Sequence, residues 1–437
     1  MSLLKDLPQP SVHRIAVHVT KAGLRAVRQG SPWLYDQAVI SHKPHGECGD
    51  LAVVFDDERR FAGIGLWDPN SPIRVKMLHS GKPTTIDAGW WKDRLQACRE
   101  FRNELLEDGT TTGFRWVHGE NDGLPGLIVD QYSNTVVVKL YSSAWFAHLA
   151  SVVEGIVAVS APERIVLRFS RTVRAGNTFG LEDGATIYGN APEAPIMFLE
   201  NGLHFEADVV QGHKTGHFLD QRDNRAIVRK MVEEQVQGGN ARCSVLDVFS
   251  STGGFTVSAA AGGAATVHMV DVSGPALATA HRNLLHNTQI PAIGRCTVTD
   301  IRGDAFAMLE EMVDEGRTFD IVILDPPSFA QNQESVHRAL GSYERLAKLG
   351  MALTANGGTL VQASCSSRID LDQLIDVADT AARASGVYLD EIRRTDHPVD
   401  HPIGFEFGAY LKALYFTISH VEGICYGRGQ GLSGNFH

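Results

Sequence analysis

The chain has 437 residues, 43% of them hydrophobic and 21% charged, an ordinary globular composition that can form two or three domains. Its formal net charge of −11 argues against indiscriminate binding to nucleic acid. The six cysteines show no C-x-x-C spacing, and the start of the chain has no apolar core long enough for a signal peptide. The most apolar tract, around 259–270, is too short to span a bilayer. We therefore expect a cytoplasmic protein with no membrane association, no disulfide framework and no structural zinc site.

Residues 1–82 predict a small β-rich domain. The segment contains alternating apolar residues at 12–20, a short helix at 21–30, strand patterns at 49–56 and 60–66, and a last strand in the segment 69–78. Residues 1–80 hold ten Lys and Arg against eight Asp and Glu, whereas the rest of the chain is acidic. This end is the better candidate for contact with RNA.

Residues 83–190 predict a small central α/β domain. A helical pattern over 90–106 is followed by a hairpin signal over 115–140, a helix over 143–159 and a strand over 164–170. The prolines at 192 and 195 lie in a loop-like stretch, which places the next domain boundary near 190.

Residues 191–437 predict the largest domain. From 244 to 363 strand and helix patterns alternate, which is typical of a parallel, doubly wound sheet. Two late strands near 388–393 and 412–418 complete seven strands, and a Gly-rich tail follows from 421. Four acids occur at or beside the expected strand ends: Asp247, Asp271, Asp300 and Asp325. Ligands bind at the carboxyl ends of such strands, so the set predicts a nucleoside-binding edge.

The first strand-to-helix turn distinguishes between nucleoside ligands. It reads Ser-Ser-Thr-Gly-Gly at 250–254 and lacks the G-x-G-x-x-G that a pyrophosphate needs. S-adenosylmethionine carries an amine, a sulfonium, ribose hydroxyls and adenine, all of which suit acidic partners. We expect Asp247 to accept from its amine, Asp271 from its ribose and Asp300 from its adenine. Each acid alone could equally be a turn or helix-cap residue.

Four segments together resemble one family: Phe-Leu-Asp-Gln-Arg at 218–222, Val-Leu-Asp-Val-Phe-Ser-Ser-Thr-Gly-Gly-Phe at 245–255, Leu-Asp-Pro-Pro-Ser-Phe at 324–329 and Ser-Cys-Ser at 364–366. They are similar to the class I methyltransferases that form 5-methylcytosine in large-subunit ribosomal RNA. The resemblance implies a Rossmann-like α/β methyltransferase domain with a seven-stranded sheet, an N-terminal β-barrel PUA domain that binds RNA, and a small central α/β domain. It also implies that ribosomal RNA is the partner and that a homodimer is possible.

The predicted cofactor-binding set combines the acids with positions that match the family's motifs. Arg222, in the segment that would close over the methionine end, is expected to pair with the cofactor carboxylate. The set is Phe218, Gln221, Arg222, Asp247, Phe249, Ser250, Thr252, Gly253, Gly254, Asp271, Ser273, Asp300 and Ile301. No metal site is expected, because the glycines beside His213 and His217 favour a loop and no third ligand is evident.

Cys365 is the predicted catalytic nucleophile. Cytosine C5 reacts with a methyl donor once a thiolate has added to C6, and Cys365 stands at the expected end of the fifth strand, beside Asp325. The position matches the family's nucleophile, and Asp325 could bond the cytosine ring. From the residues alone, a small cysteine that fills a buried strand end is an equally good interpretation. The fourth-strand motif has no second cysteine, so release of the adduct needs another group.

Two other functions stay open. Asp-Pro-Pro-aromatic motifs serve N-methyltransferases, and here Phe329 stands one residue later than in the common form. The sequence therefore also fits N-methylation of a purine in ribosomal RNA. A non-catalytic, RNA-binding ribosome assembly factor that keeps the fold is the third alternative.

Overall fold

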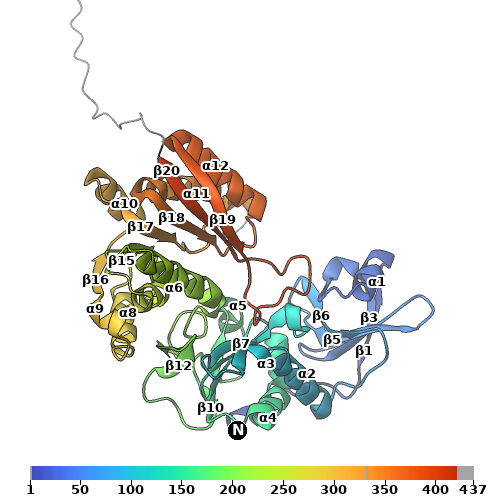
Figure 1. Ribbon diagram of the computed structural model, residues 1–437. Helices are drawn as coiled ribbons and strands as arrows, with labels where there is room; N and C mark the ends of the chain where they lie inside the picture. The colour runs from blue at the N-terminus through green and yellow to red at the C-terminus, as the bar shows by residue number, and fades with distance from the viewer. Residues whose placement is uncertain (1, 331–332, 421–437) are drawn as a thin grey trace, which may run out of the picture. The chain divides into compact units, whose positions relative to one another are not determined.

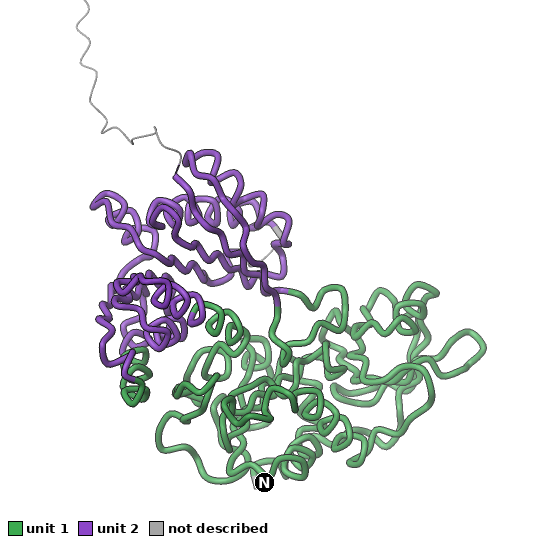
Figure 2. Tube along the Cα trace, in the orientation of Figure 1, with its two compact units in different colours: residues 1–228, 279–290, 397–409 green, residues 229–278, 291–396, 410–437 purple. Residues whose placement is uncertain are grey.

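The computed structural model describes residues 2–330 and 333–420, so the Gly-rich tail lies outside the described residues. The chain divides into two compact units (Figure 2). The first unit holds residues 1–228, 279–290 and 397–409, and the second holds 229–278, 291–396 and 410–437. The two short inserts join the first unit although the chain around them belongs to the second. The expected boundaries at 82 and 190 are finer than this division and stay predictions.

A six-stranded sheet with the order β2-β6-β5-β4-β1-β3 forms the N-terminal part of the first unit (Figure 1). Its strands are β1 Ile15–Val19, β2 Trp33–Tyr35, β3 Val39–Lys43, β4 Leu51–Phe55, β5 Phe61–Trp67 and β6 Ile73–Ser80. The helix α1 (Lys21–Arg28) begins where the Thr20 side chain accepts from the Gly23 amide. Apolar residues such as Val17 and Ile64 are fully buried, so the expected β-rich domain is confirmed.

A five-stranded sheet with the order β11-β10-β9-β8-β7 follows in the same unit. Its strands are β7 Gly113–His118, β8 Leu127–Tyr132, β9 Thr135–Leu140, β10 Arg164–Phe169 and β11 Thr186–Tyr188. The helices are α2 Ala88–Glu100, α3 Asn103–Leu106, α4 Leu149–Ser160 and α5 Arg171–Ala175. The hairpin β12 (Ile196–Glu200) and β13 (Leu203–Ala207) then turns through Asn201 and Gly202, both with positive φ.

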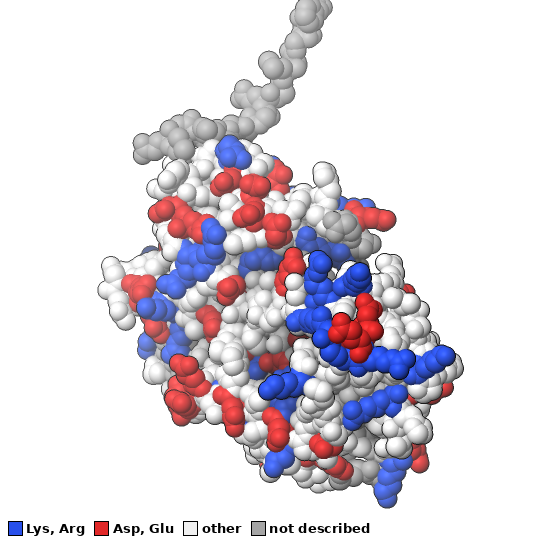
Figure 3. All heavy atoms as spheres, turned by 90° about the vertical axis from the view of Figure 1, so that its right-hand side faces the viewer, with Lys and Arg blue, Asp and Glu red and all other residues white. Residues whose placement is uncertain are grey.

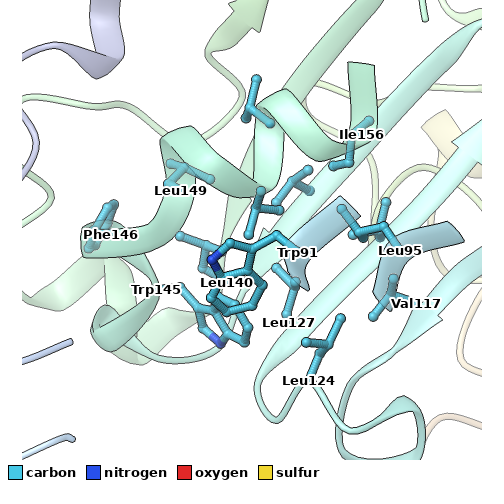
Figure 4. Packing of buried hydrophobic residues seen from close by; sticks show 14 of the residues in the cluster. Trp91, Leu95, Val117, Leu124, Leu127, Leu140, Trp145, Phe146, Leu149 and Ile156 are labelled. Atoms are coloured by element: carbon cyan, nitrogen blue, oxygen red, sulfur yellow. The ribbon is translucent and has the colours of Figure 1, made fainter. Parts of the chain in front are cut away.

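The core of this central part is rich in tryptophan (Figure 4). Trp91 and Trp145 are almost fully buried, with ring centroids 5.7 Å apart. The stretch Ser143–Ser160 is long and apolar enough to cross a membrane, but 56% of it is buried inside the protein. Its apolar character therefore has an explanation in core packing.

The second unit is built on a seven-stranded sheet with the order β16-β15-β14-β17-β18-β20-β19. Its strands are β14 Ser244–Val248, β15 Thr266–Asp271, β16 Thr297–Arg302, β17 Phe319–Leu324, β18 Thr354–Ser364, β19 Val387–Thr395 and β20 Lys412–His420. The first five strands are parallel, and β20 is antiparallel to both neighbours. The order reverses at β14, which makes the carboxyl ends of β14 and β17 the ligand-binding position of this class of sheet.

The remaining helices are α6 Arg222–Gln237, α7 Gly254–Gly262, α8 Gly274–Leu285, α9 Pro291–Arg295, α10 Ala305–Asp314, α11 Val336–Leu353 and α12 Leu371–Ser385. Every residue of α7 is buried. Its small side chains permit close packing: a Cβ at Gly262 would stand 2.5 Å from the Arg229 carbonyl oxygen. The seven-stranded, Rossmann-like prediction is confirmed. One strand end was misplaced, because β16 continues through Asp300 to Arg302.

Candidate active site

The loop between β14 and α7 has an unusual backbone. Phe249 and Ser251 both have positive φ, at 63° and 49°, and Gly253 follows at 76°. Side chains other than glycine seldom adopt this conformation, which tends to occur at functional sites. The Phe249 and Ser250 amides both donate to the Val270 carbonyl, which ties the loop to the end of β15. Thr252 is half-buried, whereas Ser250, Gly253 and Gly254 are buried.

Asp247 lies within β14, one residue before its end, and is 1% exposed. Its Oδ2 accepts from the amide of Thr256 at 3.0 Å and from the Thr256 hydroxyl at 2.7 Å. The carboxylate therefore fixes the first turn of α7 against the strand.

Asp271 is the last residue of β15, as expected, and is half-buried. Its Oδ2 accepts from the Ser251 amide at 2.8 Å, and its Oδ1 accepts from the Ser273 amide at 2.7 Å. Ser273 in turn accepts from the amide of Ala276 in the first turn of α8. Each carboxylate oxygen can accept more than one hydrogen bond, so Asp271 retains capacity for a ligand hydroxyl.

Asp300 and Ile301 lie within β16 rather than after it. Asp300 is exposed and pairs in register with Met269, and Ile301 is half-buried beside Val270. The strand was expected to end earlier because Asp is rare in strands. The strand continues three residues past the expected end at Thr299, because residues 300–302 pair in register with residues 269–271 of β15.

Cys365 and Asp325 meet at neighbouring strand ends. Asp325 directly follows β17, and Cys365 directly follows β18, the parallel neighbour. The Cys365 sulfur lies 3.9 Å from the Pro326 carbonyl oxygen, and both Cys365 and Asp325 are half-buried. The sulfur is thus against the Asp-Pro-Pro loop and partly accessible.

Phe329 packs into the core of the second unit. Its ring centroid is 5.0 Å from that of Tyr343 in an edge-to-face contact and 6.2 Å from that of Phe306. Tyr343 also bonds Ser364, the residue before the candidate nucleophile, at 3.0 Å. Phe329 thus contributes to packing around the strand end.

The remaining candidates lie in the first unit. Gln221 is buried and its Oε1 accepts from Asn224, whereas Phe218 is half-buried with the Lys214 ammonium 4.5 Å from its ring centroid. Arg222, 1% exposed, donates from Nη2 to Asp400 Oδ1 at 2.9 Å. Its Nη1 is buried without a partner within the described part of the chain.

Asp400 is a functional candidate that sequence reasoning left unassigned. Two Asp-His-Pro copies occur, at 396–398 and 400–402, and burial separates them: Asp396 is exposed, whereas Asp400 is 0% exposed. Asp400 also accepts from the Arg115 amide and faces His401 Nδ1 at 3.1 Å. Burial alone would raise the pKa of Asp400, but His401 and Arg222 hold that pKa well below its usual range.

The first unit also contains buried neutral histidines, which predict a pH dependence. Burial lowers the pKa of both His118 and His217 far below the usual 6.5. Below pH 6.5 the unfolded chain binds protons there that the folded chain does not. The contribution of these histidines to the free energy of unfolding should therefore be constant above about pH 6.5. Below that pH the free energy of unfolding should fall by about 1.4 kcal/mol per pH unit for each histidine.

Urea unfolding at pH 7.5 and pH 5.5 measures this dependence. All six tryptophans lie in residues 33–145, so their fluorescence reports on the first unit. His217→Phe should reduce the slope of unfolding free energy against pH by the contribution of one histidine, because it removes a titrating group. Phe should fit the site, since the His217 ring already packs beside Phe198 and Phe205. His13→Phe, at an exposed position, should leave it unchanged. An unchanged slope in His217→Phe would contradict the assignment.

Comparisons with known proteins identify the family of the chain. Residues 183–417 match the model of the S-adenosylmethionine-dependent methyltransferase family, and residues 17–80 match a PUA-like domain. A ribosomal RNA large subunit methyltransferase from Deinococcus radiodurans is 40% identical over 418 residues, covering 94% of this chain and 99% of the relative. Ribosomal RNA large subunit methyltransferase I from Pseudoalteromonas translucida is 33% identical, covering 91% and 98%.

Solved structures show the same fold. A methyltransferase complexed with SAH has a TM-score of 0.75 at 22% identity, covering 92% of this chain and 99% of its own. A SAM-dependent methyltransferase from Streptococcus mutans gives the same TM-score at 20% identity. With a family model that spans more than half of the sequence and relatives matched along nearly their whole length, the chain belongs to the S-adenosylmethionine-dependent methyltransferases with an N-terminal PUA-like domain, in the family of the ribosomal RNA large subunit methyltransferases I.

Proposed function

We propose that this protein forms 5-methylcytosine in 23S ribosomal RNA through a covalent adduct at Cys365. The observation that carries the proposal is the half-buried sulfur against the Asp325-Pro326-Pro327 loop, at adjacent ends of parallel strands. The two relatives named above are ribosomal RNA large subunit methyltransferases, which supports the substrate class. The PUA-like part supplies a surface for RNA: Lys21, Arg25 and Arg28 on α1 are exposed. Figure 3 shows Lys and Arg side chains around a smaller acidic group on one face.

The reaction follows from the thiolate. The Cys365 sulfur bonds to cytosine C6, and the C5–C6 electron pair moves to C5. C5 takes the methyl group as the methyl–sulfonium bond breaks and leaves a neutral thioether. C5 then loses its proton to a base, and the sulfur–C6 bond breaks to regenerate the thiolate and the aromatic ring. We propose that Asp325, which directly follows the neighbouring strand β17, bonds the cytosine ring.

Nucleoside analysis tests the proposal directly. Purified protein, S-adenosylmethionine and unmodified 23S RNA should yield 5-methylcytidine by mass spectrometry. Ribosomal RNA from cells with and without the protein should differ at the same cytosine. Appearance of a methylated purine instead would favour the N-methyltransferase alternative.

The proposed cofactor set makes a separate prediction. Asp271→Ala should weaken S-adenosylmethionine binding by about 1.5–3 kcal/mol, because the ribose hydroxyls lose a charged acceptor. Since Asp271 also holds the Ser251 and Ser273 amides, Asp271→Asn serves as the matched control. Asp271→Asn keeps one acceptor oxygen and should weaken S-adenosylmethionine binding less than Asp271→Ala does. Titration calorimetry measures both variants, and unchanged affinity in Asp271→Ala would remove Asp271 from the site.

Two further properties belong to the proposal. We expect the protein to act in the cytoplasm, and the resemblance to the family makes a homodimer possible. Light scattering coupled to size-exclusion chromatography distinguishes a dimer from a monomer of 47.6 kDa. A single monomer peak across a hundredfold range of protein concentration would remove the dimer from the proposal.

A further inference from the structure

Lys412 is a buried lysine beside the candidate nucleophile. It is the first residue of β20 and pairs in register with Ser364, the residue that precedes Cys365. Lys412 is only 8% exposed. Burying an ammonium is costly unless hydrogen bonds and nearby charge compensate it, so this lysine needs a structural or chemical reason.

The ammonium is held by the loop that carries the thiol. Lys412 Nζ donates to the carbonyl oxygens of Ser366 and Ile369, and thereby closes the turn between β18 and α12. None of the ion pairs in residues 2–330 and 333–420 gives Lys412 a carboxylate within 4.0 Å. Among these direct contacts, the two carbonyl oxygens of Ser366 and Ile369 therefore compensate the positive charge of Lys412.

Two side chains interact electrostatically with this ammonium. Burial lowers the pKa of Lys412 to about 8, and the interactions with Cys365 and Asp370 both oppose the decrease. Asp370 is the N-cap of α12, where its side chain accepts from the Gln373 amide. Because electrostatic interaction is mutual, a thiolate that favours the ammonium is itself favoured by the ammonium.

We propose that Lys412 is the positioning residue of Cys365: its ammonium fixes the loop after β18 and supplies the positive charge that keeps the sulfur a thiolate. The role in methyl transfer rests on the proposed function of Cys365. Lys412 transfers no proton. The thiol proton leaves to solvent before the sulfur attacks C6, and the ammonium again stabilises the thiolate when the adduct breaks.

The pH profile of Cys365 alkylation by iodoacetamide tests this without requiring activity. Within residues 2–330 and 333–420 the other thiols interfere little near neutral pH, because burial raises the pKa of Cys48, Cys98 and Cys243 to about 12 and that of Cys296 to about 11. Cys425 lies outside the described residues, and its peptide is followed separately. Peptide mass spectrometry on the full chain assigns the modified cysteine. Lys412→Met should move the midpoint of the profile upward by about one pH unit or more, with about a tenfold slower reaction at pH 7.

Control variants separate charge from structure. Lys412→Arg keeps the charge and should keep the midpoint, whereas Lys348→Met removes an exposed charge on α11 and should change nothing. If Lys412→Met does not fold, Lys412→Gln removes the charge but keeps a donor for the Ser366 and Ile369 carbonyl oxygens, so its midpoint should also move upward. An unshifted midpoint in Lys412→Met or, in that case, in Lys412→Gln overturns the proposal, as does an equal shift in Lys412→Arg. Methyl transfer that persists in Cys365→Ala would instead overturn the proposed function. The alkylation shift in Lys412→Met would still be observed in that case, so the two failures are distinguishable.

Discussion

Cys365→Ala should reduce methyl transfer to ribosomal RNA by on the order of 10³-fold or more, because cytosine C5 is not nucleophilic until a thiolate adds to C6. The structure places the Cys365 sulfur 3.9 Å from the Pro326 carbonyl and leaves it partly accessible. RNA that contains 5-azacytidine should trap the wild-type protein as a covalent complex that survives a denaturing gel. The complex should be absent with Cys365→Ala.

Cys296→Ala is the matched control for this experiment. Cys296 is half-buried in the same unit, and burial raises the pKa of its thiol to about 11. This variant should form the complex and methylate RNA as the wild type does. S-adenosylmethionine binding by calorimetry should survive in both variants, which separates a chemical defect from unfolding. Undiminished methyl transfer by Cys365→Ala would contradict the covalent adduct and favour N-methylation instead.

Asp400→Ala should destabilise the first unit by about 3–5 kcal/mol, because it leaves the Arg222 guanidinium buried without its counter-charge. Arg222 and Asp400 are 1% and 0% exposed, and 2.9 Å separates Arg222 Nη2 from Asp400 Oδ1. The loss also frees the Arg115 amide, which donates to Asp400 Oδ2. Urea unfolding followed by tryptophan fluorescence measures the change, since all six tryptophans lie in this unit.

The same arginine provides the control. Asp223 accepts from Arg222 Nε at 3.1 Å, but its side chain is 55% exposed, so Asp223→Ala should cost less than about 1 kcal/mol. The double variant Arg222→Met with Asp400→Leu removes both charges and should recover part of the loss. If Asp400→Ala and Asp223→Ala destabilise equally, the buried pair is not a major source of stability.

Local pattern determined the sheet and the positions of its reactive ends. Strand and helix alternation between 244 and 363 predicts parallel strands, and parallel strands necessarily bring their carboxyl ends to one edge. Asp271, Asp325 and Cys365 lie at or directly after strand ends as that rule requires. Asp300 was misplaced because its own poor strand propensity was overridden by pairing with β15.

Two relations in the structure depend on residues far apart in the sequence. Arg222 and Asp400 are 178 residues apart, and two Asp-His-Pro copies gave the sequence no means to choose between them. The sequence predicts Lys412 only as part of a late strand. The antiparallel register of β20 on β18 is what brings Lys412 opposite Ser364, the residue before Cys365. Both depend on burial and on register between distant strands.

The sequence by itself therefore determined the fold class, the methyl donor and the strand ends at which chemistry is expected, because those follow from periodicity and motif. Only the tertiary structure decided which acid neutralises Arg222 and which cation lies beside Cys365. The physical reason is that a buried charge must find its partner wherever the fold provides one, and that partner need not be near in the chain.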